Sequence, residues 1–435
     1  MMKKIVFFLL FIPFITLSQH SISGTFAPAE KYSKAFLYKV EVSFPQYVSY
    51  TSIESDGTVS LTLPESLEPG MYRIVCGLPE DEYYFDFLYN GSEDVVFHFE
   101  YEKGASFSAS KENMILQEYK AKIDEAQKEI NTTFDPDISK KTFLNAFQAI
   151  ENIQNDYEKQ SEGMIVHHYI RTGRLPIPLH KIDLETFKNL EKEHFFDHID
   201  FNDPFLQNSD YLKNASLIYT IRFADSTQSE TYFENIDRIA AKAGDNPLLK
   251  KSIFEKMWYH FSEDNNMPVA NYIADNYLKS LTEEFGDKKL LIDINTYQNT
   301  AIGATAPDFD LGDSEMMSEL NNAEHYLLIF WSSTCSHCLK ELPQVKTFLQ
   351  TTDTDTVQVI AFGLEDGDLP WKESIKAYPR FIHVFGEGKW ENPVSNTYGV
   401  MQTPTYIILD VDKKIVAKPE SLDDLKKKLK TLIKS

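Results

Sequence analysis

The sequence of 435 residues predicts a multi-domain protein with an N-terminal β-sandwich, a central all-α region and a C-terminal α/β fold. Three successive patterns along the chain support this class. Apolar residues alternate up to about residue 105, recur every three or four positions from about 110 to 297, and then lie in strand-like segments that alternate with helix-like ones. We expect a signal peptide at 1–18, a β-sandwich domain at 19–108, a helical domain at 109–297 and an α/β domain at 298–435.

The first segment has the composition of a secretory signal peptide. Lys3 and Lys4 precede an apolar run that ends at Leu17, and small residues such as Ser18 follow it. The run is shorter than the roughly 20 apolar residues that span a bilayer. We therefore expect cleavage after Ser18 and export to the periplasm, with a signal-anchored form left as the alternative.

The β-sandwich is predicted from alternation between turn signals. Asp56-Gly57 and Asn90-Gly91 are typical hairpin turns. Three sets of apolar residues are each expected to share one face of a strand: Phe36, Tyr38, Val40, Val42 and Phe44; Val59, Leu61 and Leu63; Val95, Phe97 and Phe99. Cys76 continues the register of Tyr72 and Ile74, which predicts a buried core thiol. The alternative is a second redox-active or intermolecular cysteine.

The helical region shows apolar residues at helical spacing. These are Ile115, Tyr119, Ile123, Ala126 and Ile130; Phe143, Phe147, Ile150, Ile153 and Tyr157; and Leu249, Ile253, Met257 and Phe261. Proline-containing breaks at 134–136, 176–178 and 244–247 are expected to connect helices.

The C-terminal region predicts strands and helices in alternation. We expect strands at 326–331, 357–363, 405–410 and 415–418, and a helix from Ser336 to about Gln350. Ser421 is expected to cap a last helix that carries Leu422, Leu425 and Leu429.

Cys335 and Cys338 are the candidate reactive residues. They are separated by two residues at the exit of the strand that ends at Trp331 and at the start of the next helix, which is the arrangement of a reversible dithiol/disulfide pair. The unpaired amides and the dipole of a helix N-terminus stabilise a thiolate. Cys335 is therefore the expected nucleophile and Cys338 the resolving thiol.

Five motifs occur in the order found in one family. They are Ala306-Pro-Asp-Phe309, Phe330-Trp331, Cys335-Ser-His-Cys338, Lys340-Glu-Leu-Pro343 and Thr403-Pro-Thr405. On these motifs the C-terminal domain resembles the thioredoxin fold, and within it the exported TlpA/ResA-like thiol-disulfide oxidoreductases. The whole layout is similar to a multi-domain form common in Bacteroidetes-type bacteria.

The resemblance implies further site residues. Pro404 would follow a cis peptide bond, and Thr403 and Trp331 would contact the client protein. Glu341 lies three residues after Cys338, so its carboxylate can exchange a proton with the thiols. Ile329 stands where thioredoxin has a buried aspartate, so the buried acid of the site is expected to be Glu341.

The resemblance predicts an exported enzyme that exchanges disulfides with client proteins and acts as a reductant. His337 favours a thiolate at Cys335, which favours a disulfide oxidant or isomerase as the alternative. The second alternative is a binding or docking protein in which residues 19–297 carry the main function. No metal, nucleotide or flavin is implied, so reducing equivalents would come from a membrane thiol carrier. The net charge of −23 argues against nucleic acid as a partner.

Other interpretations of the cysteines, and a second candidate site, have less support in the sequence. Zinc needs four ligands, yet the remaining cysteine, Cys76, lies in another predicted domain. A structural disulfide over so short a loop would restrict the unfolded chain little. The peroxiredoxin motif has proline where this chain has Leu328. His194, Asp197 and His198 lie at helical spacing, but the intervening Phe195 and Phe196 favour a structural helix end.

Overall fold

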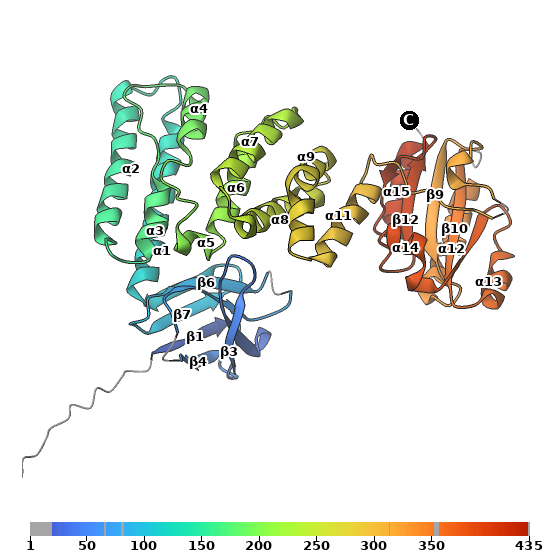
Figure 1. Cartoon of the computed structure of the whole chain (residues 1–435), viewed down its shortest axis with the longest axis horizontal. Helices are drawn as coiled ribbons and strands as arrows, with labels where there is room; N and C mark the ends of the chain where they lie inside the picture. Colours follow the sequence, from blue (N-terminus) through green and yellow to red (C-terminus); the bar gives the residue numbers. More distant parts are fainter. Residues whose placement is uncertain (1–19, 65–66, 80–81, 313, 352–355, 434–435) are drawn as a thin grey trace, which may run out of the picture. The chain divides into compact units, whose positions relative to one another are not determined.

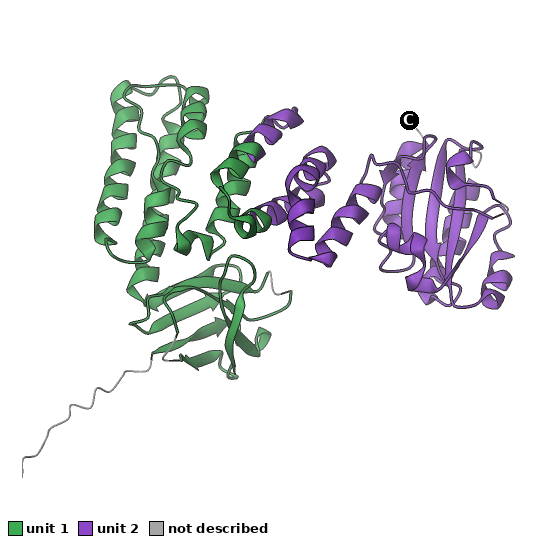
Figure 2. Cartoon of the chain, in the orientation of Figure 1, with its two compact units in different colours: residues 1–224, 237–252 green, residues 225–236, 253–435 purple. Residues whose placement is uncertain are grey.

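The computed structural model describes residues 20–64, 67–79, 82–312, 314–351 and 356–433 (Figure 1). The predicted signal peptide at 1–18 lies outside the described residues. The chain forms two compact units, residues 1–224 with 237–252, and residues 225–236 with 253–435 (Figure 2). The division between the units falls inside the helical region, and the four-part division made from the sequence stays a prediction. No helix in the described part of the chain is long and apolar enough to cross a bilayer.

The first unit begins with two four-stranded sheets that pack face to face. One sheet has the order β4-β1-β7-β8 and the other β3-β2-β5-β6. The strands are β1 (Ser21–Ala27), β2 (Lys34–Lys39), β3 (Gln46–Ser52), β4 (Thr58–Thr62), β5 (Gly70–Val75), β6 (Tyr84–Tyr89), β7 (Val95–Glu100) and β8 (Gly104–Ala109). Side chains from both sheets, among them Ile22, Leu37, Tyr72 and Phe97, form one core. The β-sandwich prediction is confirmed.

The residues expected to share one face at β4 and at β7 are all buried. The set expected at β2 does not share one face of a strand, because Val40, Val42 and Phe44 lie beyond its end. β2 ends at Lys39 and buries Ala35 and Leu37, while Phe36 and Tyr38 lie on the opposite face. Phe36 stacks on Tyr50 of β3, with ring centroids 5.7 Å apart. Cross-strand aromatic pairs on an outer face produce the same alternation as a core, so the pattern alone did not identify the inward side.

Cys76 is buried in the sandwich core, as predicted. Its side chain is 5% exposed, and its thiol donates to the carbonyl oxygen of Tyr83 at 3.3 Å. Burial raises the pKa of this thiol to about 12. Cys76 is therefore a poor nucleophile at neutral pH.

The central region is helical, as predicted, and each of the three proline-containing breaks lies in a connection between helices. Its helices are α1 (Lys111–Thr132), α2 (Lys140–Gln160), α3 (Val166–Ile170), α4 (Leu184–His194), α5 (Pro204–Gln207), α6 (Tyr211–Arg222), α7 (Ser229–Lys242), α8 (Pro247–Glu263), α9 (Met267–Ile273), α10 (Lys279–Glu284) and α11 (Lys288–Thr300). The predicted apolar residues of these helices are buried, except that Ile153 is half-buried.

The second unit contains a five-stranded sheet in the order β11-β10-β9-β12-β13. Its elements are β9 (His325–Trp331), α12 (Ser336–Thr351), β10 (Val357–Glu365), α13 (Asp368–Ile375), β11 (Ile382–Glu387), α14 (Pro393–Thr397), β12 (Thr405–Asp410), β13 (Ile415–Ala417) and α15 (Leu422–Leu432). β9, β10 and β11 are parallel, and β12 is antiparallel to β9. The carboxyl ends of β9, β10 and β11 and the start of β12 therefore lie at one edge of the sheet.

Both faces of this sheet are covered, which explains the continuous apolar run of β9. Leu327, Ile329 and Trp331 point into a core with α12 and α15. Tyr326, Leu328 and Phe330 point into a second core with the segment that precedes β9. Ser421 caps α15, because its hydroxyl accepts the N–H of Asp424 at 3.2 Å. The α/β prediction is confirmed, although β11 was not predicted.

Candidate active site

The two cysteines lie at the start of α12, next to the first residues of β12. A short turn after β9 is closed by the N–H of Cys335, which donates to the carbonyl oxygen of Ser332 at 3.1 Å. The N–H of Cys338 donates to the Sγ of Cys335 at 3.2 Å, and this Sγ lies 3.4 Å from the carbonyl oxygen of Thr403. Cys335 is half-buried and Cys338 is fully buried. Of these two sulfurs, only that of Cys335 is therefore accessible from outside the protein.

The two thiols have opposite acidities. Burial acts to raise the pKa of Cys335, but hydrogen bonds from Cys338, from Thr403 and from the N–H groups of Cys338 and His337 outweigh it and leave the pKa lowered. For Cys338, burial and then its hydrogen bond with Cys335 raise the pKa to about 12. The ring of His337 is exposed, and the contribution of this residue to the lowered pKa of Cys335 comes from its backbone N–H.

Alkylation should separate the three cysteines. At pH 7 the reduced protein is expected to react with iodoacetamide at Cys335 and to leave Cys338 and Cys76 unmodified, because only Cys335 has a lowered pKa. Modification of Cys335 should begin at lower pH than that of a free cysteine, since the thiolate fraction rises as the pKa falls. Peptide mass spectrometry measures the rates. Equal rates at Cys335 and Cys338 would contradict the assignment.

Thr403 and Pro404 lie beside the reactive sulfur, as expected, and the Thr403-Pro404 peptide bond is cis. Both residues are half-buried, so part of each remains open to a partner. Trp331 is different, because its side chain is 0% exposed and packs in the same core as Cys338. A buried side chain cannot contact a client, so the prediction for Trp331 is corrected from client contact to support beneath the site.

Glu341 is half-buried on α12, and Tyr406 of β12 holds its carboxylate. The hydroxyl of Tyr406 donates to Oε2 of Glu341 at 2.7 Å. Burial, and next the hydrogen bond to Glu341, raise the pKa of Tyr406, so this residue stays a neutral donor. Both cysteines add to this shift electrostatically, and Tyr406 packs in the same core as Cys338. Tyr406 was not predicted from the sequence.

Replacing Tyr406 by phenylalanine tests this hydrogen bond. Tyr406→Phe is expected to lower the free energy of unfolding by about 1 kcal/mol, because a charged acceptor loses a buried donor. The matched control is Tyr326→Phe in the same sheet, since the buried hydroxyl of Tyr326 makes no hydrogen bond among the described residues. Urea unfolding measures both variants. A loss no larger for Tyr406→Phe than for Tyr326→Phe would contradict the role of Tyr406.

The C-terminal part of the sequence is similar to known proteins. Residues 322–415 match a family model described as thioredoxin-like. The C-terminal domain is thioredoxin-like. Its sequence is 29% identical over 119 residues to the thiol-disulfide oxidoreductase ResA of Bacillus thuringiensis, a match that covers 26% of this chain and 67% of the relative. ResA of Geobacillus thermodenitrificans is 25% identical over 144 residues, which are 30% of this chain and 78% of that protein.

Parts of this chain are also similar to solved structures. The thioredoxin domain of a thiol-disulfide oxidoreductase from Bacteroides vulgatus is 23% identical, with a TM-score of 0.28, over 31% of this chain and 98% of that one. A thioredoxin-like protein from Bacteroides caccae is 18% identical, with a TM-score of 0.37, over 59% of this chain and 98% of its own.

A second acid of the thioredoxin-like domain, Glu365, was also missed in the sequence. It is 2% exposed at the end of β10, whereas Glu341, expected to be the buried acid, is half-buried. One carboxylate oxygen of Glu365 accepts the N–H of Ser333 at 2.5 Å, and the other accepts the Ser333 hydroxyl at 2.9 Å. Ser332 lies 3.5 Å from the same carboxylate. Glu365 therefore fixes the turn that leads into Cys335.

The histidines singled out in the sequence do not converge on a metal site. Nδ1 of His194 lies 2.7 Å from the carboxylate of Asp197, and both side chains are exposed. Phe196 is buried in the helical core, as a structural helix end requires. Within the described ranges, no three His, Cys, Asp or Glu residues lie close enough together to hold a metal ion.

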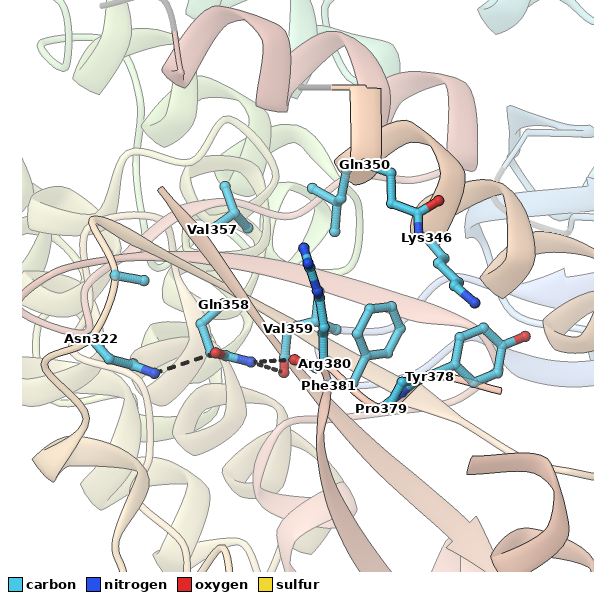
Figure 3. A pocket seen from close by; sticks show the side chains of 12 residues that line it. Asn322, Lys346, Gln350, Val357, Gln358, Val359, Tyr378, Pro379, Arg380 and Phe381 are labelled. Carbon is cyan, nitrogen blue, oxygen red and sulfur yellow. Dashed lines mark hydrogen bonds between the residues drawn. The ribbon is translucent and has the colours of Figure 1, made fainter. Parts of the chain in front are cut away.

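A pocket of about 590 Å³ opens at the opposite edge of the thioredoxin-like sheet (Figure 3). It lies at the starts of β10 and β11, and Gln358 crosses it with hydrogen bonds to Asn322 at 3.3 Å and to the carbonyl oxygen of Arg380 at 3.1 Å. The predicted site residues, all of which are described, do not line this pocket. It is therefore separate from the cysteine site.

Proposed function

We propose that this protein is an exported thiol-disulfide oxidoreductase that exchanges disulfides with client proteins through Cys335 and Cys338, chiefly as a reductant. The relationship of the C-terminal domain to ResA-type oxidoreductases supports the reaction class. The observation that carries the assignment is the pairing of a half-buried Cys335, whose pKa is lowered, with a buried Cys338 one helical turn away.

The proposed exchange has two steps. The Cys335 thiolate attacks one sulfur of a client disulfide, so that the client S–S bond breaks, a mixed disulfide forms and the second client sulfur leaves as a thiolate. Cys338 then gives its proton to the carboxylate of Glu341 and attacks the Cys335 sulfur. The bond between Cys335 and the client breaks, and the client leaves in its reduced form. The two electrons that the client gains are those that Cys335 and Cys338 lose when they form their disulfide.

A cycle needs a source of two electrons to reduce the Cys335–Cys338 disulfide again. We infer that a membrane thiol carrier supplies them. A thiol partner fits because the same half-buried sulfur of Cys335 that receives a client can receive the attacking thiolate of the carrier.

Equilibration with glutathione buffers tests the proposed couple. We expect Cys335 and Cys338 to convert reversibly between dithiol and disulfide, and a Cys76→Ser variant to behave in the same way because Cys76 is buried in the sandwich. A reduction potential near the thioredoxin value of about −270 mV supports a reductant, and one near about −120 mV supports the alternative, an oxidant. Failure of the two cysteines to form a disulfide under oxidising conditions would exclude the mechanism.

A further inference from the structure

Large apolar side chains are exposed around the cysteine site. In the described part of the thioredoxin-like domain, from 302 onward, six large apolar residues are exposed, and four of them belong to segments at the edge that carries Cys335. These four, the apolar rim, are Leu339, Leu369, Trp390 and Met401. Met401 is 89% exposed and Leu369 is 75% exposed. Exposed apolar side chains gathered in one area are typical of an interaction surface.

The topology of the sheet places the four rim segments at one edge. Leu369 lies in α13, which follows the end of β10, and Trp390 follows the end of β11. Met401 precedes β12, which runs in the opposite direction, and Leu339 directly follows Cys338. Because β9, β10 and β11 are parallel, all four segments lie at the same edge of the sheet. Leu369 and Trp390 therefore follow strands on one side of β9, and Met401 precedes the strand on the other side. β9 is the strand that leads to the cysteines.

Negative charge without a partner accompanies the rim. Glu387 and Glu391 flank Trp390 in sequence, are exposed and make no ion pair among the described residues. Two other exposed acids nearby have a cation partner, since Asp366 pairs with Lys389 at 2.8 Å and Asp368 pairs with Lys372. The surface beside the rim thus has two uncompensated carboxylates.

We propose that the apolar rim, with Glu387 and Glu391, is a docking surface for an extended client segment that carries apolar side chains and a lysine or arginine close to its reactive cysteine. The inference rests on the proposed function and adds the kind of client. Apolar side chains of the client would cover the rim, and its cation would compensate the carboxylates. Opposite charges across an interface favour one partner over another more than they raise affinity in general.

Three peptide disulfides of equal length test the surface. The first has Leu and Lys beside its cysteine, the second has Leu and Glu, and the third has Gly and Ser. Each kcat/KM value is divided by that for hydroxyethyl disulfide, measured with the same protein, because this small molecule does not reach the rim. We expect the Leu and Lys peptide to react about tenfold faster than the Leu and Glu peptide, as two exposed charge contacts permit. The ratio should fall as salt is added, because salt screens exposed charges.

Two double variants assign the effect to this surface. Glu387→Gln with Glu391→Gln should remove most of the charge preference, and Leu369→Ser with Trp390→Ser should remove the preference for leucine over glycine. The matched control is Val411→Ser, since Val411 is 54% exposed at the opposite edge, beyond the end of β12. This control should leave every ratio unchanged.

The outcomes separate the surface from the reaction. The docking surface would be overturned if, for each peptide, the ratio of its kcat/KM to that of hydroxyethyl disulfide were the same in the wild-type protein and in both double variants. A protein that dimerises, and whose dimer is lost in the Leu369→Ser with Trp390→Ser variant, would also overturn it, because a second copy would then cover the rim. Absence of exchange with hydroxyethyl disulfide would instead contradict the proposed function.

Discussion

Replacing Cys335 by serine is expected to reduce disulfide exchange to the uncatalysed rate. Cys335 has the half-buried sulfur and the lowered pKa, whereas Cys338 is buried and its pKa is raised to about 12. A hydroxyl at position 335 stays protonated at neutral pH and forms no disulfide, so neither step of exchange remains. Exchange with hydroxyethyl disulfide, followed through the thiol released, measures the loss.

Cys76→Ser is the matched control for this experiment. It also removes one thiol, but from the sandwich core in the other unit of the chain. We expect the exchange rate of Cys76→Ser to equal that of the wild-type protein. Retention of exchange in Cys335→Ser, or its loss in Cys76→Ser, would place the nucleophile elsewhere.

Replacing Glu365 by leucine should destabilise the thioredoxin-like domain by about 3 kcal/mol, because the buried N–H and hydroxyl of Ser333 lose a charged acceptor. Leucine fills much of the volume but accepts no hydrogen bond. Glu365→Gln keeps one carbonyl oxygen and should cost less. Urea unfolding followed by tryptophan fluorescence is suited to this domain, since three of the four tryptophans, Trp331, Trp371 and Trp390, lie in it.

Asp366→Ala is the neighbouring control. Asp366 is exposed and pairs with Lys389 at the surface, so its loss should change the free energy of unfolding by less than about 0.5 kcal/mol. If Glu365→Leu is as stable as Asp366→Ala, the hydrogen bonds to Ser333 do not hold the turn as the structure indicates. In that case the position of Cys335 must depend on α12 alone.

The cysteine site could be predicted because its geometry is local. A buried strand, a short turn and a helix start follow one another between Tyr326 and Cys338, and a helix N-terminus directs its free amides toward the residue that precedes the helix. The N–H of Cys338 accordingly reaches the sulfur of Cys335. The position of Thr403 beside this sulfur came from the family resemblance, because 68 residues separate it from Cys335.

The acids around the site depend on strand register, which no local pattern encodes. Tyr406 meets Glu341 across 65 residues, and Glu365 meets Ser333 across 32 residues. The second contact follows from the pairing of Gly363 with Trp331 in the parallel strands β10 and β9. The sequence placed Glu341 near the site and predicted it to be the buried acid, whereas the buried acid is Glu365, which the sequence did not place there.

The alternation of apolar residues also did not show which face of a strand points into the core. Phe36 lies in β2 but faces away from the sandwich core, which the alternation of this segment did not indicate. An apolar residue on an outer face can be satisfied by an aromatic neighbour, as Tyr50 does for Phe36. β11 was missed because it is an edge strand in which His383, Gly386 and Glu387 interrupt the apolar pattern.

The central claim is that Cys335 forms mixed disulfides with client proteins that Cys338 then releases. Expressing the full chain with Cys338→Ala in its native cell envelope tests this most directly. We predict adducts that are linked to Cys335, are released by a reducing agent and are absent when Cys335→Ser is added. Absence of any adduct, while Cys335 is intact and open to alkylation, would contradict the account.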